Sequence, residues 1–207
     1  METAVFPAAA WTLAVLFLGP TLFLVARYGI LGRRRDALAA VLGASTGMAA
    51  WGMAWPFGAS ALFAARPDLL IAHLLVGVFV LALIGLRLLR RAWRGAMDGG
   101  ASSPAPPATW APAYIDGLII NLTDPRPAHI TAAAVTMLSV GDQAASPEFV
   151  GLFGLVAAVA AFALFAVVLS TATVSRLFRS RSWSWGVDGV AGLGLMATAI
   201  RLLLVAD

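Results

Sequence analysis

The side chains that could do chemistry gather in one apolar stretch in the second half of the chain. They are Asp116, Asn121, Asp124, Arg126 and His129. An ionised side chain in apolar surroundings is costly unless it is paired, so these residues are candidates for function. Asp124 and Arg126 could neutralise each other across a break in a helix. His129 could relay protons, or it could be a hydrogen-bonded packing residue.

Two prolines lie where they would interrupt helices. Gly19 precedes Pro20 in the first apolar run, and Asp124 precedes Pro125 in the fourth. Proline removes one backbone donor and clashes with the preceding turn, which leaves carbonyl groups free. Interrupted helices at matching places in two halves of a transporter mark a central site, where helix N-termini attract anions and free carbonyls attract cations. The alternative is a plain kink packed against a neighbouring helix.

A third pattern has the form of a catalytic motif but is better explained by packing. Gly43, Ser45 and Gly47 match G-x-S-x-G, the sequence around the nucleophile of many serine hydrolases. That motif requires a strand, a turn and a helix, whereas these residues lie in an apolar run. Small residues at every fourth position, from Ala39 onward, predict close helix packing instead. A hydrolase that pairs Ser45 with His129 is a distant alternative.

The composition is that of an integral membrane protein. Hydrophobic residues make up 61% of the 207 residues and charged residues 12%, and the mean hydropathy is +0.90. A soluble domain carries roughly twice as many charges. The chain has no cysteine, which excludes thiolate metal sites, and all 14 basic residues are arginine, which excludes a lysine base. Basic cytoplasmic loops explain the net charge of +4 better than nucleic-acid binding does.

Six apolar runs are each long enough to cross a bilayer, since one helical span takes about 20 residues. A linker rich in Gly, Ser and Pro, residues 95–112, divides this single transmembrane domain into repeat one, 1–94, and repeat two, 113–207. Three spans per half is an odd number, so the second half is inverted relative to the first. We therefore predict an all-α integral membrane protein with six transmembrane helices as two inverted three-helix repeats. The runs are 6–29, 37–63, 69–89, 113–139, 148–174 and 184–205.

The arginines predict the orientation. Eleven of the 14 lie in the first, third and fifth connections, which the positive-inside rule assigns to the cytoplasm. Both chain termini are then outside the cytoplasm. The eleven are Arg27, Arg33, Arg34, Arg35, Arg87, Arg90, Arg91, Arg94, Arg176, Arg179 and Arg181.

Two further carboxylates have ordinary explanations. Asp116 could be solvated at the cytoplasmic interface beside Tyr114, or it could act within the membrane. Asp188 opens the sixth run, where a carboxylate at the N-cap or in the first turn stabilises a helix.

Three stretches resemble a known family. They are LGPTLFLVARYGILGRRRDALAAVLGASTG (18–47), GVFVLALIGLRLL (77–89) and YIDGLIINLTDPRPA (114–128). Their order and spacing are similar to those of the lysine exporter (LysE/RhtB-like) translocators, and the resemblance covers nearly the whole chain. That family exports amino acids and related solutes from bacteria. The resemblance therefore implies a secondary transporter in the bacterial cytoplasmic (inner) membrane, and not an enzyme.

The chain departs from the family pattern at several positions. Thr21 stands where the family often has Asp or Asn, and Asp124 and Arg126 replace the Asn and Lys of N-P-K. These differences indicate a divergent member whose substrate could differ from lysine, threonine or homoserine. By resemblance, the substrate-binding residues are Gly19, Pro20, Thr21, Asn121, Asp124, Pro125 and Arg126, and a proton relay would use Asp124 and His129.

The sequence thus predicts export of a small zwitterionic or cationic solute, such as an amino acid, driven by proton antiport or by the membrane potential. No cofactor, metal or nucleic acid is expected. The partners are the solute, membrane lipid and protons as the coupling ion, and a homo-oligomer of the chain is left open. An exporter of metal or other inorganic cations is the main alternative, and a structural membrane scaffold is the third. The lack of cysteine and of a dense His and carboxylate cluster argues against soft metals.

Overall fold

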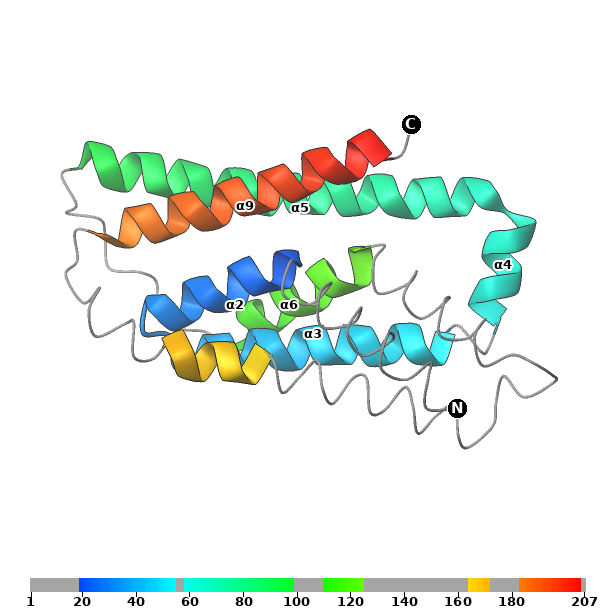
Figure 1. The fold of residues 1–207 in the computed structure, drawn as a ribbon, viewed down its shortest axis with the longest axis horizontal. Helices are drawn as coiled ribbons and strands as arrows, with labels where there is room; N and C mark the ends of the chain where they lie inside the picture. The colour runs from blue at the N-terminus through cyan, green and yellow to red at the C-terminus, as the bar shows by residue number, and fades with distance from the viewer. Residues whose placement is uncertain (1–18, 55–57, 99–109, 125–163, 172–182, 206–207) are drawn as a thin grey trace, which may run out of the picture.

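The computed structural model describes residues 19–54, 58–98, 110–124, 164–171 and 183–205 (Figure 1). All regular structure in these ranges is helical, as predicted. The helices are α2 (Pro20–Ile30), α3 (Arg34–Ala54), α4 (Ser60–Ala65), α5 (Pro67–Met97), α6 (Trp110–Thr123) and α9 (Ser184–Val205), with a further helical segment at 164–171.

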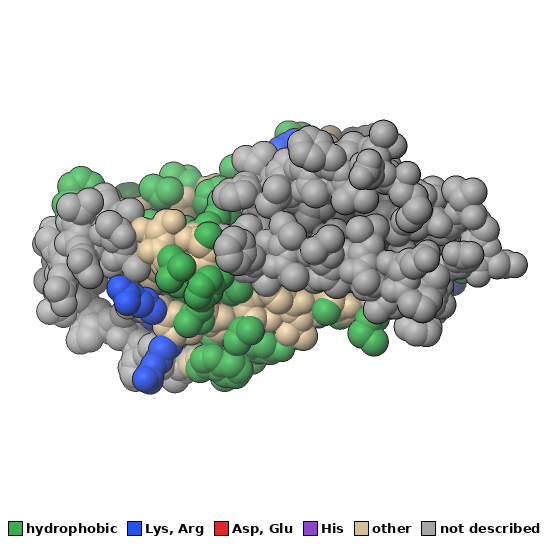
Figure 2. All heavy atoms as spheres, turned by 60° about the horizontal axis from the view of Figure 1, so that its bottom comes forward, with side chains coloured by type: hydrophobic (Ala, Val, Ile, Leu, Met, Phe, Trp, Pro, Cys, Tyr) green, Lys and Arg blue, Asp and Glu red, His purple; other side chains and the backbone are tan. Residues whose placement is uncertain are grey.

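Within the described ranges, α3, α5 and α9 are long and apolar enough to cross a membrane. Large apolar side chains on these helices point outward; Phe79 on α5 is 63% exposed and Leu204 on α9 is 71% exposed. In Figure 2, apolar side chains cover much of the visible described surface, and the most prominent arginines lie towards one end. An exposed apolar surface of this extent is typical of a protein surrounded by lipid.

The helices α2 and α6 are shorter because each meets a proline. Gly19 is extended, with φ −81° and ψ 155°, and α2 begins at Pro20. Proline is favoured at the first helical position, where its missing N–H is not needed. The helix α6 ends at Thr123, before Asp124 and Pro125. A residue that precedes proline is disfavoured in the helical conformation, so both predicted breaks coincide with a helix end.

Two predicted runs have different limits in the structure. The run 37–63 is not one helix, because α3 ends at Ala54, two residues before Pro56, and α4 follows as a separate helix. The helix α5 continues past the expected end at residue 89 to Met97. Arginine favours helices and its long side chain can reach polar surroundings, so the basic turns at this end stay helical. The predicted linker 95–112 therefore overlaps the ends of α5 and α6.

The helices α3 and α6 approach each other at backbone distance. A Cβ atom on Gly43 would collide with the carbonyl oxygen of Tyr114, and one on Gly117 would collide with the carbonyl oxygen of Ala40. Gly47 lies in the same contact, further along both helices. Contacts that advance together along two helices mean that the helices run parallel. The prediction that Gly43 and Gly47 serve helix packing is confirmed.

The helices α5 and α9 form a second glycine-lined pair. A Cβ atom on Gly192 would lie 2.9 Å from the carbonyl oxygen of Gly85 and 2.9 Å from Cγ of Leu89. One on Gly189 would lie 3.6 Å from Cβ of Ala92. Residue numbers at the contact rise along α5 from 85 to 92 while they fall along α9 from 192 to 189, so these two helices are antiparallel (Figure 1).

The helix α2 joins the two pairs, since it contacts α3, α6 and α9. Leu24 and Val25 on α2 are fully buried in the core. On the α9 side, the ring of Phe23 covers Gly194, where a Cβ atom would lie 2.5 Å from Cε1 of the ring. The backbone of α2 also meets the segment 164–171, because a Cβ atom on Gly29 would collide with the side chain of Thr171.

Candidate functional site

The start of α2 and the end of α6 lie at the same depth in the helix bundle. Oη of Tyr28 donates a hydrogen bond of 3.3 Å to Oδ2 of Asp116, which ties α2 to α6. Pro20 precedes Tyr28 by eight residues, and Asp124 follows Asp116 by eight. The two helices run in opposite directions (Figure 1). At about 1.5 Å per residue, both breaks are therefore about 12 Å from that hydrogen bond, on the same side of it.

The helix α2 begins in the protein interior without a side-chain cap. Pro20 and Thr21 are buried, and the Gly19 carbonyl accepts the N–H of Leu22 at 3.0 Å. The first N–H groups of a helix have no intrahelical partner and carry the positive end of its dipole. Electrostatic attraction is stronger in buried surroundings than in water, so this helix end suits a carboxylate.

The end of α6 supplies the opposite character. Asp124 is 5% exposed and lies directly after the last helical residue; its N–H donates to the Ile120 carbonyl at 3.0 Å. Asn121 is 9% exposed, and its Oδ1 has no hydrogen-bond partner among the described residues. That oxygen faces Gly47 of α3, where a Cβ atom would lie 3.0 Å away. Buried acceptors at the negative end of a helix attract a cationic group.

The structure thus brings five of the eight predicted site residues to one depth and does not describe the other three. Gly19, Pro20 and Thr21 lie at one helix end, and Asn121 and Asp124 lie at the other. Three further predicted residues lie outside the described ranges: Pro125, Arg126 and His129. The expected pairing of Asp124 with a following arginine, and the proton relay through the histidine, stay predictions.

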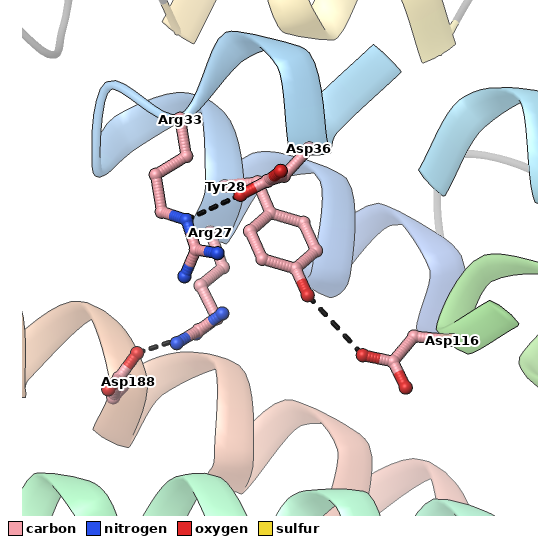
Figure 3. Close-up of polar contacts among 6 residues, drawn as sticks. All are labelled: Arg27, Tyr28, Arg33, Asp36, Asp116 and Asp188. Atoms are coloured by element: carbon pink, nitrogen blue, oxygen red, sulfur yellow. Dashed lines mark hydrogen bonds and ion pairs between the residues drawn. The ribbon is translucent and has the colours of Figure 1, made fainter. Parts of the chain in front are cut away.

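A second polar cluster lies near the other end of α2 (Figure 3). Nε of Arg27 on α2 donates to Oδ1 of Asp188 on α9 at 2.5 Å. The Arg27 side chain is 5% exposed and the Asp188 side chain 15% exposed. Removing one partner of such a buried ion pair leaves an uncompensated charge, at a cost of about 3–5 kcal/mol. The contact between α2 and α9 therefore depends on both charges being present together.

Two guanidinium groups lie near the ring of Tyr28 in this cluster (Figure 3). The Cζ atoms of Arg27 and Arg33 are each 5.2 Å from the ring centroid, a distance at which cations are attracted to aromatic rings. Nε of Arg33 donates to Oδ2 of Asp36 at 2.6 Å, and Asp36 is fully buried at the start of α3. Tyr28 thus contacts two arginines, of which one pairs with Asp188 on α9 and the other with Asp36 on α3.

Three interpretations from the sequence change here. Arg27 is not a loop residue, because it lies within α2 and is buried. Asp188 is neither an N-cap nor a first-turn residue, because α9 begins four residues earlier at Ser184. Asp116 is half-buried and bonded to Tyr28, so it is not simply solvated. The sequence held one signal for the missed ion pair: Arg27 and Asp188 carry opposite charges at the ends of apolar runs, where charges need partners.

The two alternatives from the sequence, a serine hydrolase and a metal-cation exporter, gain no support from the described residues. Ser45 lies within α3 and donates its hydroxyl to the Val41 carbonyl one turn earlier, at 2.9 Å. It therefore lacks the strand–turn–helix setting of a hydrolase nucleophile. No group of three His, Asp or Glu side chains that could hold a metal ion occurs within the described ranges.

Comparison with known proteins gives an independent answer. Residues 12–205 match the family model of the LysE type translocators. The chain is 28% identical over 194 residues to the threonine efflux protein of Salmonella typhi, and 28% identical over 196 residues to that of Escherichia coli (strain K12). Each alignment covers 92% of this chain and 92% of the relative. No solved structure matches.

The match extends over nearly the whole chain, so it includes both helix breaks and the polar cluster. It confirms the resemblance inferred from the sequence, and with it the expectation of a membrane translocator in place of an enzyme. The chain belongs to the LysE type translocator family.

Proposed function

We propose that this protein exports amino acids from the bacterial cytoplasm, with threonine as the first candidate. The relatives that carry the name threonine efflux protein align along nearly their full length. The observation that carries the proposal is the juxtaposition of two buried helix ends at one depth: the uncapped start of α2 and the end of α6 beside Asp124.

A zwitterion matches these two helix ends. Its carboxylate would bind the N–H of Thr21, the first N–H of α2 after Pro20, assisted by the hydroxyl of the same residue. Its ammonium group would bind the carboxylate of Asp124 and Oδ1 of Asn121, which has no hydrogen-bond partner in the described part of the chain. Discontinuous helices in secondary transporters hold substrate in this way near the middle of the membrane.

The directions of the helices support the inverted-repeat architecture. In the proposed arrangement, α2 and α6 are the first helices of the two repeats, and α5 and α9 are the third. Both pairs are antiparallel (Figure 1). Equivalent helices of inverted repeats must point in opposite directions, so the six-span arrangement, with both termini outside the cytoplasm, accounts for both pairs.

The proposal is tested by efflux. Cells that express the protein are loaded with labelled amino acids, one at a time, from a panel that includes threonine, serine, lysine and leucine. We expect the label to leave faster than from cells with an empty vector for at least threonine. If expressing cells release every member of the panel at the control rate, amino-acid export is wrong.

The orientation is tested with two exposed aspartates at opposite ends of α5. The chain has no cysteine, so Asp68→Cys and Asp98→Cys each introduce a single thiol. We expect a membrane-impermeant maleimide to label the first variant in intact cells and the second only after permeabilisation, because the arginine-rich end faces the cytoplasm. The reverse pattern would invert the proposed topology and leave the repeats untouched.

A further inference from the structure

The Arg27–Asp188 ion pair joins the two helix pairs of the bundle. Arg27 belongs to α2, which packs against α3 and α6, and Asp188 belongs to α9, which packs against α5. One helical turn from Arg27, Phe23 rests on Gly194. The contact between α2 and α9 therefore includes a ring packed on a glycine and a buried ion pair. The ring can leave the glycine without exposing a charge. The ion pair cannot open unless Arg27 and Asp188 each find another charged partner.

The ion pair lies at the arginine-rich end of the bundle, which the proposed topology places in the cytoplasm. It is separate from the helix breaks, because Arg27 follows Pro20 by seven residues, or about 10 Å along α2. The pair is not completely sealed, since the Asp188 side chain is 15% exposed. A solute that arrives from the cytoplasm would meet this contact before it reached the breaks.

We propose that Arg27 and Asp188 form a cytoplasmic loading site that opens when it takes the charged head group of an amino acid. The inference rests on the proposed function. A zwitterion carries a carboxylate and an ammonium group on one carbon. Its carboxylate can bind Arg27 in place of Asp188, and its ammonium group can bind Asp188 in place of Arg27. Both buried charges stay paired while the two side chains separate. Water or an uncharged solute offers no such exchange, so the empty protein stays closed at this end.

The neighbouring residues hold Arg27 ready for that exchange. The ring of Tyr28 is held by its hydrogen bond to Asp116 and lies against the Arg27 guanidinium. Asp36, the one carboxylate on α3, already pairs with Arg33. Asp188 accepts from Nε of Arg27, and among the described residues the two terminal nitrogens of the guanidinium have no hydrogen-bond partner, so they suit a bidentate bond to a substrate carboxylate.

The test follows the separation of α2 and α9 in the full-length protein in lipid bilayers. The double variant Ile30→Cys/Trp185→Cys places one label on each helix. Each label is three residues from the ion pair, toward the arginine-rich end of the bundle. The labelled protein is first shown to transport threonine. Electron paramagnetic resonance then gives the distance between two nitroxide labels. We expect threonine to lengthen this distance. Threonine amide, which has no carboxylate, and N-acetylthreonine, which has no ammonium group, should leave it unchanged.

The neutral double variant Arg27→Gln/Asp188→Asn removes both charges together and so avoids a single unpaired charge. In this background we expect the long distance without substrate, no further response to threonine, and a half-saturation concentration for threonine raised about tenfold. The matched control is Arg66→Gln/Asp68→Asn, an ion pair of the same residue types whose side chains are 62% and 60% exposed. That control should keep the wild-type response.

The two proposals fail in different ways. A labelled protein that transports threonine while its distance stays fixed would overturn the loading site and leave amino-acid export intact. An equal lengthening with threonine amide or N-acetylthreonine would also overturn it, because the paired exchange of charges would then be unnecessary. A wild-type protein that transports no amino acid would overturn the proposed function, and the loading site with it. The measurement on the wild-type background decides the matter even if the neutral double variant fails to fold.

Discussion

Among glycine-to-alanine substitutions in α3 and α6, Gly117→Ala and Gly43→Ala should destabilise the protein most. We take Gly117→Ala as the example. The new Cβ atom would collide with the backbone carbonyl of Ala40, and a backbone cannot turn aside as a flexible side chain can. Overpacking costs about 1–3 kcal/mol where side chains can adjust, so we expect about 3 kcal/mol or more here. For a chain of this length that corresponds to a fall in melting temperature on the order of 6–12 °C.

The matched control for this prediction is Gly186→Ala. Gly186 also lies in a helix, but apart from its chain neighbours and its own helix backbone no atom of the described residues lies within 4 Å of the position where its Cβ would be. We expect a change within about 0.5 kcal/mol, as for an unconstrained surface site. Thermal unfolding of both variants in detergent gives the comparison. Equal melting temperatures for the two variants would mean that the close approach of α3 and α6 does not contribute to stability.

Asp124→Asn should have the largest effect on transport among the substitutions that preserve side-chain shape. The asparagine keeps the size of the aspartate and restores the residue more common in the family pattern, but it removes the charge. A hydrogen bond to a charged group contributes about 1.5–3 kcal/mol, so loss of an ammonium partner should weaken substrate binding about 10- to 150-fold. We expect the response of transport to a pH gradient to persist. Transport kinetics in proteoliposomes, with and without the gradient, measure both quantities.

The same experiment distinguishes the two roles open to Asp124. If affinity is normal and acceleration by the pH gradient is lost, Asp124 carries the coupling proton instead of the substrate charge. If affinity and pH response both equal those of the wild type, Asp124 has no part in the mechanism. Asp68→Asn serves as the control, because it removes an equal charge from an exposed position on the predicted outer side. It should change neither quantity.

The sequence predicted those features that depend on local chemistry. The run 184–205 agrees with α9, because hydropathy over twenty residues is a strong signal. The helix ends at Pro20 and Asp124 follow from proline itself, and the packing role of Gly43 follows from small residues at helical spacing. Each of these depends on residues only a few positions apart.

The features that the sequence missed depend on distant residues. Arg27 and Asp188 are 161 residues apart, and nothing in either local sequence says that the two side chains meet. Each had a satisfactory local explanation, as a loop arginine and as a helix-capping carboxylate. The end of α3 at Ala54 was missed because the apolar character continues past Pro56, so hydropathy alone did not separate α3 from α4.

The most direct test of amino-acid export through the helix breaks is counterflow with purified protein. Proteoliposomes loaded with unlabelled threonine are diluted into labelled threonine, and the transient uptake of label is followed. The wild type should accumulate label above equilibrium. Pro20→Ala, which lets α2 continue through the break, should insert normally and show no overshoot. Wild-type overshoot that persists unchanged in Pro20→Ala would contradict the role of the breaks, and the absence of overshoot for every amino acid tried with the wild type would contradict the export function.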